Sequence, residues 1–284
     1  MEKQVLVWQF WRSKIPMSKV NYYGVLEQHD INDDVVLQAA EEISNLGYSV
    51  IDSGYPINQV EEIARIFDIV HSRYVDKYGR CFLKKIDEFN GVRLPLAFDP
   101  VFLDMALNPI ITSLVKLLVR SEFYLNQQNA IINPPRKPYN QDAFHRDLPY
   151  QHFVSSRPLA INALFCVDNF TKLNGATTVI PCSHKSEKFP SNTFIENHAL
   201  SIEAPAGSFI VLDCMVFHKG GFNNTERPRR AVNHVYTIPH LKQQINIANV
   251  LDFSSDLSDY EREILGCKYQ ASTSIDDYLK SRDK

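Results

Sequence analysis

Residues 122 to 240 contain a series of short segments that are rich in Val, Ile, Phe, Tyr and Thr. Gly, Pro and Asn separate them, as is typical of turns between strands. Short strands joined by turns at this spacing form an antiparallel sandwich or a jelly roll. The pattern therefore predicts a mainly β core. The segments read EFYLNQQNAII, LAINALFCVD, TTVIP, GSFIVLD and AVNHVYTIP.

The first third of the chain is predicted to be largely helical. Val36, Ala40 and Ile43 share one helical face, and Gly47 follows them as a stop signal. A strand is expected at YSVID, residues 48–52. Helices are expected where apolar residues repeat at i, i+3 and i+4 between residues 60 and 70, and at FLDMALNP and ITSLVKLLV.

We expect a single domain over residues 1–284, because no repeat, low-complexity tract or Gly/Ser linker divides the chain. Its helical N-terminal part covers about residues 30–120, and its jelly-roll core about residues 122–240. A helical C-terminal tail follows at residues 250–284.

The charge of the chain gives no reason to expect a nucleic-acid or membrane partner. The formal net charge is −3, from 30 basic and 33 acidic residues. The basic clusters PPRKP (134–138) and RPRR (227–230) are short and are typical of loops or sites. No run reaches the ~18 apolar residues that a membrane helix needs. We expect a small-molecule substrate, while the oligomeric state has no sequence signal.

The five cysteines are widely spaced and form no C-x-x-C pair. This spacing disfavours a disulfide framework or a zinc ribbon. The N-terminus lacks the features of a secretory signal peptide. We therefore expect reduced thiols and a cytoplasmic location.

The stretch AFHRDLPYQHF (143–153) contains a His-x-Asp triplet, which is weak evidence of a metal site by itself. At the end of a strand, His145 and Asp147 would point to the same side. His218 lies 71 residues after Asp147, enough for the chain to return to the barrel mouth. Two imidazoles and one carboxylate on one face match the facial triad of non-haem Fe(II) oxygenases.

An arginine provides a second indication of this chemistry. Arg229 follows His218 by 11 residues, across a loop and into a predicted strand. A dicarboxylate that chelates iron at one end needs a cation for its other carboxylate, and arginine can bind that group in a bidentate fashion. Arg230 would face the other side of the strand.

With these residues in place, the chain resembles the phytanoyl-CoA dioxygenase-like (PhyH) family of Fe(II)/2-oxoglutarate-dependent oxygenases. The resemblance covers roughly residues 30–280. It depends on HRD, NGATTVIPCSHK (174–185), His218 and NNTERPRRAVNHVY (223–236), together with GYSVID and LSDYEREILG.

The resemblance implies a double-stranded β-helix, which is a cupin-like jelly roll, with flanking helices. It also implies Fe(II) on His145, Asp147 and His218, and 2-oxoglutarate on Arg229. The implied reaction uses O₂ and hydroxylates or otherwise oxidises an unactivated C–H bond of a small metabolite, with succinate and CO₂ as co-products.

Three positions depart from the pattern of the family. Cys182 stands where the family usually has glycine, so it must hold a backbone conformation that glycine normally takes. Gly220 stands where many members carry a serine that assists the co-substrate carboxylate, and another polar group would have to replace it. Asn133 stands where many members carry lysine.

Period 2 in the strand YLNQQNAIIN places Gln127, Asn129, Ile131 and Asn133 on one face. Three amides on one face are unusual for core packing. We expect this face to point into the barrel and to bind 2-oxoglutarate or substrate, with a solvent-exposed face as the alternative. Asn162 and Thr177 are further candidates for the barrel lining and co-substrate binding.

Tyr150 and His152 lie close to the HRD triplet and are weaker candidates for substrate contacts. Two other functions fit the same fold. One is a non-catalytic jelly-roll binding protein, and the other is a cupin-type sugar isomerase that uses histidine as a base without iron. An intact triad with Arg229 favours the oxygenase.

Overall fold

The structure is a computed structural model that describes residues 31, 33–148, 153–251 and 257–283. Contacts group residues 34–284 into one compact unit. The assignment of residues 1–33 to the same domain therefore stays a prediction.

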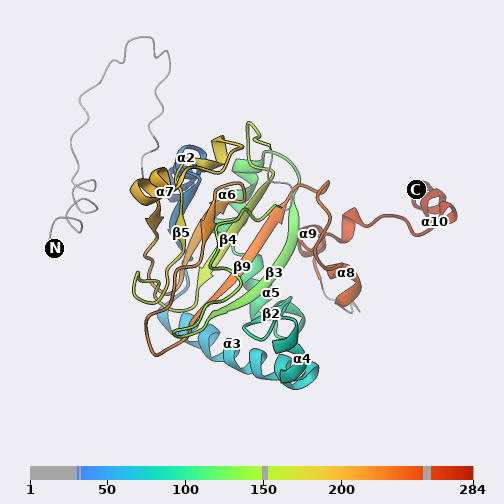
Figure 1. Cartoon of the computed structure of the whole chain (residues 1–284). Helices are drawn as coiled ribbons and strands as arrows, with labels where there is room; N and C mark the ends of the chain where they lie inside the picture. Colours follow the sequence, from blue (N-terminus) through green and yellow to red (C-terminus); the bar gives the residue numbers. More distant parts are fainter. Residues whose placement is uncertain (1–30, 32, 149–152, 252–256, 284) are drawn as a thin grey trace, which may run out of the picture. The chain divides into compact units, whose positions relative to one another are not determined.

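Six antiparallel strands form the main sheet, in the order β1-β7-β4-β9-β3-β2 (Figure 1). A second sheet of three short strands has the order β6-β5-β8. The strands are β1 (Tyr48–Asp52), β2 (Gly91–Arg93), β3 (Tyr124–Asn133), β4 (Ala160–Cys166), β5 (Thr178–Val179), β6 (Leu200–Ser201), β7 (Ser208–Asp213), β8 (His218–Lys219) and β9 (Arg229–Thr237).

The predicted fold class, a mainly β jelly roll with flanking helices, is confirmed. Each of the five strand-like segments of the sequence contains one strand, namely β3, β4, β5, β7 or β9. The predicted strand at residues 48–52 is β1. Within the described residues the two sheets do not join into a closed barrel. Strands β2, β6 and β8 were not predicted, because two or three residues carry too little periodicity.

The helices begin and end where the local sequence provides caps. In α2, the Asp34 carboxylate accepts hydrogen bonds from the backbone N–H groups of Val36 and Leu37. Gly47 ends this helix with φ of 89°, a left-handed conformation that favours glycine. The helices are α2 (Val35–Leu46), α3 (Ile57–Tyr78), α4 (Arg80–Lys85), α5 (Val101–Ala106), α6 (Pro109–Val119), α7 (Asn192–His198), α8 (Ile247–Val250), α9 (Asp259–Ile264) and α10 (Ile275–Arg282).

The expectation that no stretch is apolar and long enough to cross a membrane needs one correction. Residues 101–119 reach this length with a hydropathy of 1.6. Asn108 divides them into α5 and α6, because its side chain caps α6 through the backbone N–H groups of Ile110 and Ile111. Half of the stretch is buried in the protein, as in helices of a protein core.

The main sheet is buried on both faces. Ile161, Ala163 and Phe165 of β4 belong to the apolar cluster that includes the helices. Leu164 and Cys166 alternate with them and belong to a second cluster, which the short sheet shares. This period-2 alternation places the short sheet opposite the inner face of the main sheet.

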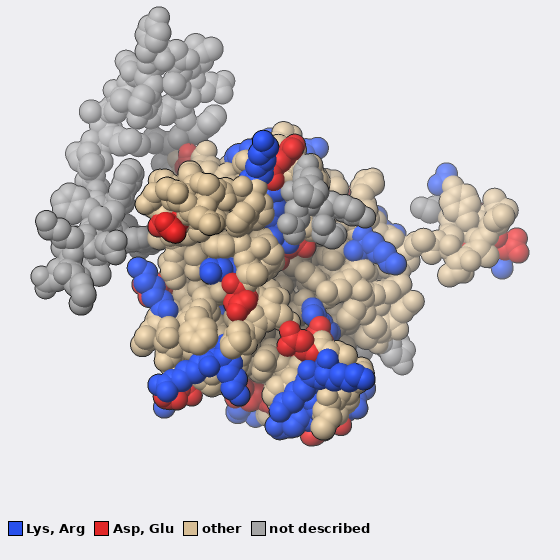
Figure 2. All heavy atoms as spheres, in the orientation of Figure 1, with Lys and Arg blue, Asp and Glu red and all other residues tan. Residues whose placement is uncertain are grey.

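Charged side chains of both signs are mixed on the face shown in Figure 2. Lysines and arginines are most frequent at the bottom of this view, over the region of α3 and α4 in Figure 1. All five cysteines are free thiols. The cytoplasmic location stays a prediction.

One buried histidine makes the fold sensitive to acid. The His234 side chain has 0% exposure, and its Nε2 has no described partner. Burial lowers its pKa from 6.5 to about 4. As the pH falls below 6.5, the unfolded chain therefore binds a proton that the folded chain does not bind. We expect the free energy of unfolding to fall by up to about 3 kcal/mol from this group between these two values.

Urea unfolding of the wild type and of His234→Leu, at pH about 7.5 and about 4.5, measures this contribution. The variant should lose less stability on acidification than the wild type. Equal losses in the two proteins would contradict the assignment.

Candidate active site

Three side chains that the sequence singled out lie close together in the structure. Backbone N–H groups of His145 and His218 each donate to the carbonyl of the other residue, at 2.9 and 3.0 Å. Asp147 Oδ1 lies 3.6 Å from His218 Nε2 and 4.0 Å from His145 Nε2. One ligand atom from each residue lies within 4.8 Å of the others. This arrangement can hold one metal ion.

The two imidazoles are oriented for metal binding by backbone carbonyls. His145 Nδ1 lies 2.9 Å from the carbonyl oxygen of Ala143, and His218 Nδ1 lies 3.1 Å from that of Val216. A proton on each Nδ1 satisfies these contacts and leaves each Nε2 with a free lone pair. Burial also lowers the pKa of His218, with the Asp147 carboxylate acting in the opposite direction. The neutral ring is the form that binds a metal.

Asn162 holds the carboxylate of Asp147. Its Nδ2 donates to Asp147 Oδ2 at 2.9 Å, while Oδ1 is the oxygen that faces both histidines. Hydrogen bonds of this kind fix the ligand orientation and tune metal affinity. Asn162, predicted to bind co-substrate, therefore contacts a metal ligand in this structure.

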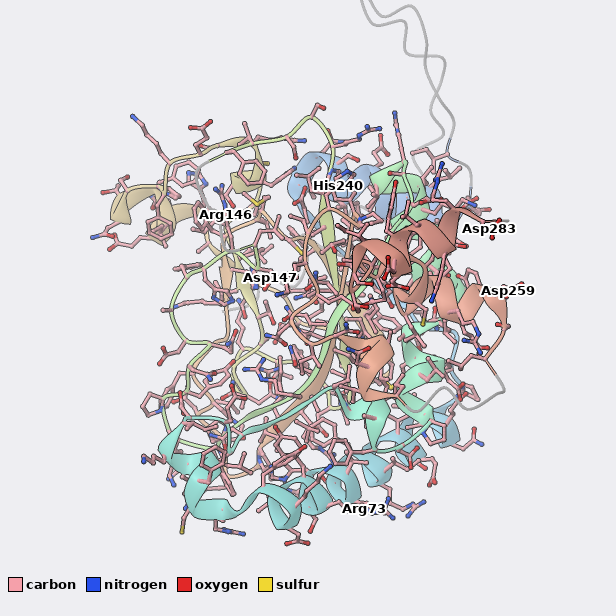
Figure 3. The ribbon with its side chains drawn as sticks, turned by 90° about the vertical axis from the view of Figure 1, so that its right-hand side faces the viewer. Arg73, Arg146, Asp147, His240, Asp259 and Asp283 are labelled. Carbon is pink, nitrogen blue, oxygen red and sulfur yellow. The ribbon has the colours of Figure 1, made fainter. Side chains whose placement is uncertain are left out.

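The arginine inside the HRD triplet, Arg146, contacts the segments that lie next to His218. Figure 3 shows Arg146 and Asp147 next to each other near the middle of the view. Arg146 Nε donates to the carbonyl of Met215 at 2.6 Å, and Nη2 donates to that of Ser183 at 2.9 Å. Its guanidinium also stacks on Phe217, 4.0 Å from the ring centre. These contacts connect HRD to the PCSH segment and to the residue before His218.

That PCSH segment turns as the comparison with the family pattern predicted. Cys182 has φ of 63°, in the left-handed region that favours glycine. The Ser183 hydroxyl then accepts a hydrogen bond from the backbone N–H of Phe217 at 2.8 Å. The turn therefore positions the strand that carries His218.

Arg229 lies in a small cavity of about 50 Å³ beside the three ligands. Its side chain is 3% exposed, and its Nε has no described hydrogen-bond partner. No described carboxylate pairs with it, since nearby Asp168 pairs with Arg230 instead. Burial lowers the pKa of Arg229. A buried cation without a counter-ion is costly, so an anionic ligand would stabilise this position.

Tyr139 is a site residue that sequence reasoning missed. Arg229 Nη2 donates to its hydroxyl oxygen at 3.4 Å, which leaves the hydroxyl proton available to an anion in the small cavity. A Cβ atom at Gly220 would lie only 1.6 Å from this oxygen. Tyr139 thus occupies the space that a serine at residue 220 would need, the serine that many members of the resembled family carry. The only sequence signal was the glycine at residue 220.

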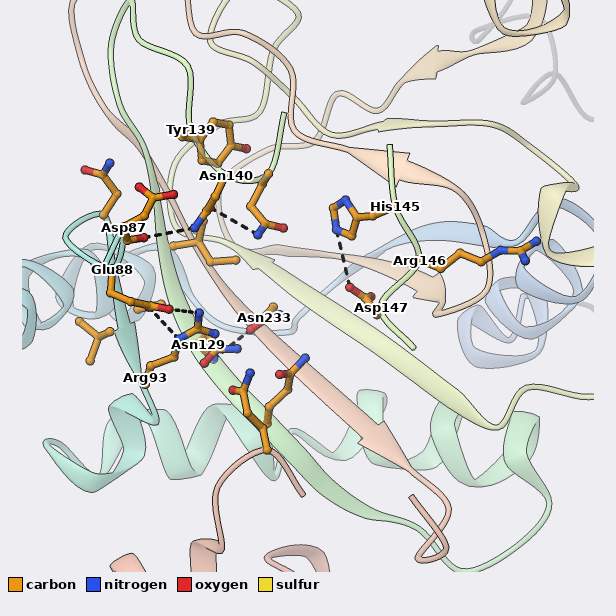
Figure 4. Close-up of a pocket in the computed structure, with 18 residues that line it drawn as sticks. Asp87, Glu88, Arg93, Asn129, Tyr139, Asn140, His145, Arg146, Asp147 and Asn233 are labelled. Carbon is orange, nitrogen blue, oxygen red and sulfur yellow. Dashed lines mark hydrogen bonds and ion pairs between the residues drawn. The ribbon is translucent and has the colours of Figure 1, made fainter. Parts of the chain in front are cut away.

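A larger cavity of about 320 Å³ adjoins the small one, because Tyr139, His145 and Asp147 line both. Gln127 and Asn129, which the period-2 pattern placed on one face of β3, line this larger cavity. Figure 4 shows Asn129 and Asn233 at the sheet, with His145 and Asp147 on the opposite side.

The remaining candidates from the sequence are distributed as follows. Thr177 lines the small cavity. Asn133 lines neither cavity, and its Nδ2 donates to the carbonyls of Gly221 at 2.9 Å and Gly175 at 3.4 Å. Asn133 therefore holds the backbone of the Gly175 and Gly221 segments, and its role in co-substrate binding stays a prediction. Tyr150 and His152 lie outside the described residues.

Known proteins share this sequence pattern. The family profile described as "Phytanoyl-CoA dioxygenase (PhyH)" matches residues 44–231. The uncharacterized protein Rv1501 of Mycobacterium tuberculosis is 28% identical over 260 residues, which cover 89% of this chain and 94% of that protein. Dioxygenase af480 of Aspergillus fumigatus is 29% identical over 205 residues, or 67% of this chain and 64% of that protein.

Solved structures share the fold at lower identity. EctD from S. alaskensis, crystallised with bound Fe, is 19% identical with a TM-score of 0.62, covering 75% of this chain and 81% of that one. The epimerase SnoN, solved with Fe³⁺ and alpha ketoglutarate, is 16% identical with a TM-score of 0.57, covering 79% and 92%. Because the PhyH profile matches most of the sequence and its metal-ligand residues converge in space, the chain belongs to the phytanoyl-CoA dioxygenase (PhyH) family of iron- and 2-oxoglutarate-dependent oxygenases.

Proposed function

We propose that this protein is an Fe(II)/2-oxoglutarate-dependent dioxygenase that hydroxylates an unactivated C–H bond of a small molecule. One observation carries the proposal. A facial set of two imidazoles and one carboxylate lies beside a buried arginine that has no described counter-ion. A keto acid with a second carboxylate is a ligand that needs both features.

Each residue has a defined task in this reaction. His145, Asp147 and His218 would hold the iron, with Asn162 orienting the carboxylate. Arg229 and Tyr139 would bind the distal carboxylate of 2-oxoglutarate in the small cavity. Iron, 2-oxoglutarate and O₂ supply the oxidising chemistry, with succinate and CO₂ as co-products. The larger cavity would hold the substrate against the open side of the three ligands.

The two other functions considered from the sequence receive less support. A binding protein has no need to retain three ligands, their oriented Nδ1 atoms and an unpaired buried arginine together. An isomerase without iron would need one histidine placed as a base. Here both Nε2 atoms face the same carboxylate oxygen, which suits a shared metal ion.

Spectroscopy and product analysis test the proposal. Addition of 2-oxoglutarate to the anaerobic Fe(II) protein should produce a weak visible charge-transfer band, and admission of air should release succinate. A correctly folded, iron-loaded protein that gives neither the band nor succinate would overturn it. Succinate release that a chelator does not inhibit would indicate a different activity, one that does not depend on a metal.

Replacement of Tyr139 tests the co-substrate site. Tyr139→Phe removes one hydroxyl that faces the anion and leaves the ring in place. We expect the Kd for 2-oxoglutarate, measured by titration of the charge-transfer band, to rise about 10-fold, which corresponds to one hydrogen bond to a charged group. An unchanged Kd would show that the hydroxyl does not contact the co-substrate.

A paired exchange gives a stricter version of this test. Gly220→Ser alone should weaken 2-oxoglutarate binding, because its Cβ would collide with the Tyr139 hydroxyl. Gly220→Ser combined with Tyr139→Ala removes the collision and supplies a new hydroxyl. We expect the double variant to bind 2-oxoglutarate more tightly than either single variant, and additive losses would contradict this geometry.

A further inference from the structure

The larger cavity beside the metal ligands is walled by side-chain amides. They come from strands β3 and β9 and from segments outside the strands, and they include Gln127, Asn129, Asn140, Gln141, Asn233 and Gln244. Its volume of about 320 Å³ lies near the lower end of the roughly 300–1,000 Å³ typical of ligand pockets. Such pockets are lined mostly by apolar side chains, so an amide-rich wall needs a specific reason.

Strand register places the polar side chains in one row. Asn129 of β3 pairs with Arg93 of β2 on one side and with Asn233 of β9 on the other. Paired residues of neighbouring strands point to the same face. The row therefore faces the cavity together, as Figure 4 shows for these three side chains.

The amides at the base of the cavity are not fully used by the protein. Asn129 is 7% exposed, and its Oδ1 has no described partner. Asn233 Oδ1 accepts a hydrogen bond from the backbone N–H of Asn129 at 2.9 Å. A buried polar atom without a partner costs about 1–3 kcal/mol. A ligand that donates a hydrogen bond to Asn129 Oδ1 would remove this cost.

The two arginines that line the cavity are already bound within the protein. Arg93 is paired with Glu88, whose Oε2 lies 2.8 Å from Arg93 Nε. The guanidinium of Arg146 is bound to backbone carbonyls on the far side of the HRD segment. Asp87 adds a carboxylate at the edge. Phosphate groups and carboxylates would thus enter without a counter-ion.

These features match one class of molecule. Each amide offers donors and an acceptor, and each hydroxyl group of a polyol offers a donor and an acceptor. Apolar chains would bury the amides without partners, and anions would face carboxylates. We propose that the substrate is a neutral, polyhydroxylated small molecule of the carbohydrate type. The amide side chains that line the cavity, here called the amide row, would hold it with one C–H bond directed at the metal ligands. This inference rests on the proposed oxygenase function.

A matched set of probes tests the substrate class. The Fe(II) protein with 2-oxoglutarate is first checked for the charge-transfer band and then exposed to air with each probe. The neutral probes are the methyl glycosides of glucose, galactose, mannose and rhamnose, together with myo-inositol. The comparison probes are glucose 6-phosphate, gluconate and octanoyl-CoA. Succinate is measured against the rate without a probe.

At least one neutral probe should raise succinate release, and the comparison probes should not. If octanoyl-CoA or an acidic probe stimulates release, or if no neutral probe does, the substrate class is wrong. The charge-transfer band distinguishes a failure of the proposed substrate class from a failure of the proposed oxygenase function. With the band present, failure of the neutral probes overturns the substrate class alone, whereas an absent band overturns the oxygenase function as well.

Asn129→Leu provides the second test. The variant should keep the charge-transfer band and the Kd for 2-oxoglutarate, while its response to the active neutral probe should fall about 10-fold or more. Its melting temperature should not decrease, because the change removes an unpartnered buried amide. Asn45→Leu, an exposed amide on α2, serves as the matched control and should keep the full response.

A structural role for Asn129 would give a different result. If the amide only supports the sheet, Asn129→Leu should lower the melting temperature and leave the probe response of the remaining folded protein unchanged. This outcome would overturn the assignment of the amide row to substrate binding.

Discussion

Replacement of Arg229 by glutamine should weaken 2-oxoglutarate binding strongly while iron still binds. The side chain is almost fully buried, no described carboxylate neutralises it, and its Nε has no described partner. Loss of one partner of a buried ion pair costs about 3–5 kcal/mol, so we expect the Kd for 2-oxoglutarate to rise at least about 100-fold. Titration of the charge-transfer band and calorimetry measure this Kd.

In the absence of 2-oxoglutarate, the Arg229→Gln variant should not lose stability. Arg229 is a buried cation without a described counter-ion. Its removal should therefore leave the free protein as stable as the wild type or more stable. The wild type should gain about 2.7 kcal/mol from 2-oxoglutarate at a concentration of 100 Kd, and the variant should gain almost nothing. Thermal unfolding with and without the co-substrate shows both effects.

Arg230→Gln is the matched control for Arg229→Gln. The two arginines are neighbours, but the Arg230 guanidinium binds Asp168 and Asp68, with distances of 2.7 and 2.8 Å. Its loss should lower stability and leave the Kd for 2-oxoglutarate unchanged. If Arg229→Gln bound 2-oxoglutarate as the wild type does, the assignment of the small cavity would be wrong.

Replacement of His218 by alanine should remove iron binding and reduce turnover to background. His218 provides one of three ligand atoms, and its position next to Asp147 depends on the backbone bridge to His145. Groups that only orient metal ligands contribute about 10–100-fold to affinity or activity, so loss of a ligand should exceed about 100-fold. Iron content after desalting and succinate release measure the two effects.

Asn162→Leu and His198→Ala are comparison variants for His218→Ala, with an intermediate expected loss and no expected loss. Asn162 orients Asp147 without being a ligand, so its replacement should cost about 10–100-fold in turnover. His198 lies exposed on α7 and lines neither cavity, so its replacement should cost nothing. If His218→Ala retained iron and activity as His198→Ala does, another residue would have to be the third ligand.

Local patterns of the sequence predicted most of the secondary structure. Alternation in LAINALFCVD identified β4, and the apolar repeat before Gly47 identified α2 with its left-handed end. The short strands β2, β6 and β8 were missed because their pairing depends on neighbours that are distant in the chain. Helices α5 and α6 were predicted, but their burial in the core is not encoded in their hydropathy.

The sequence by itself predicted the three candidate metal ligands that the structure brings together, the arginine beside them and the amide face of β3. These depend on residue type and on side-chain alternation, which are properties of the chain over a few residues. Only the tertiary structure decided that Arg229 has no described counter-ion, that Tyr139 fills the space at Gly220 and that Asn133 holds backbone. The contacts of Tyr139 and Asn133 join residues about 40 to 90 positions apart, and packing of the two sheets, rather than local spacing, brings such residues together.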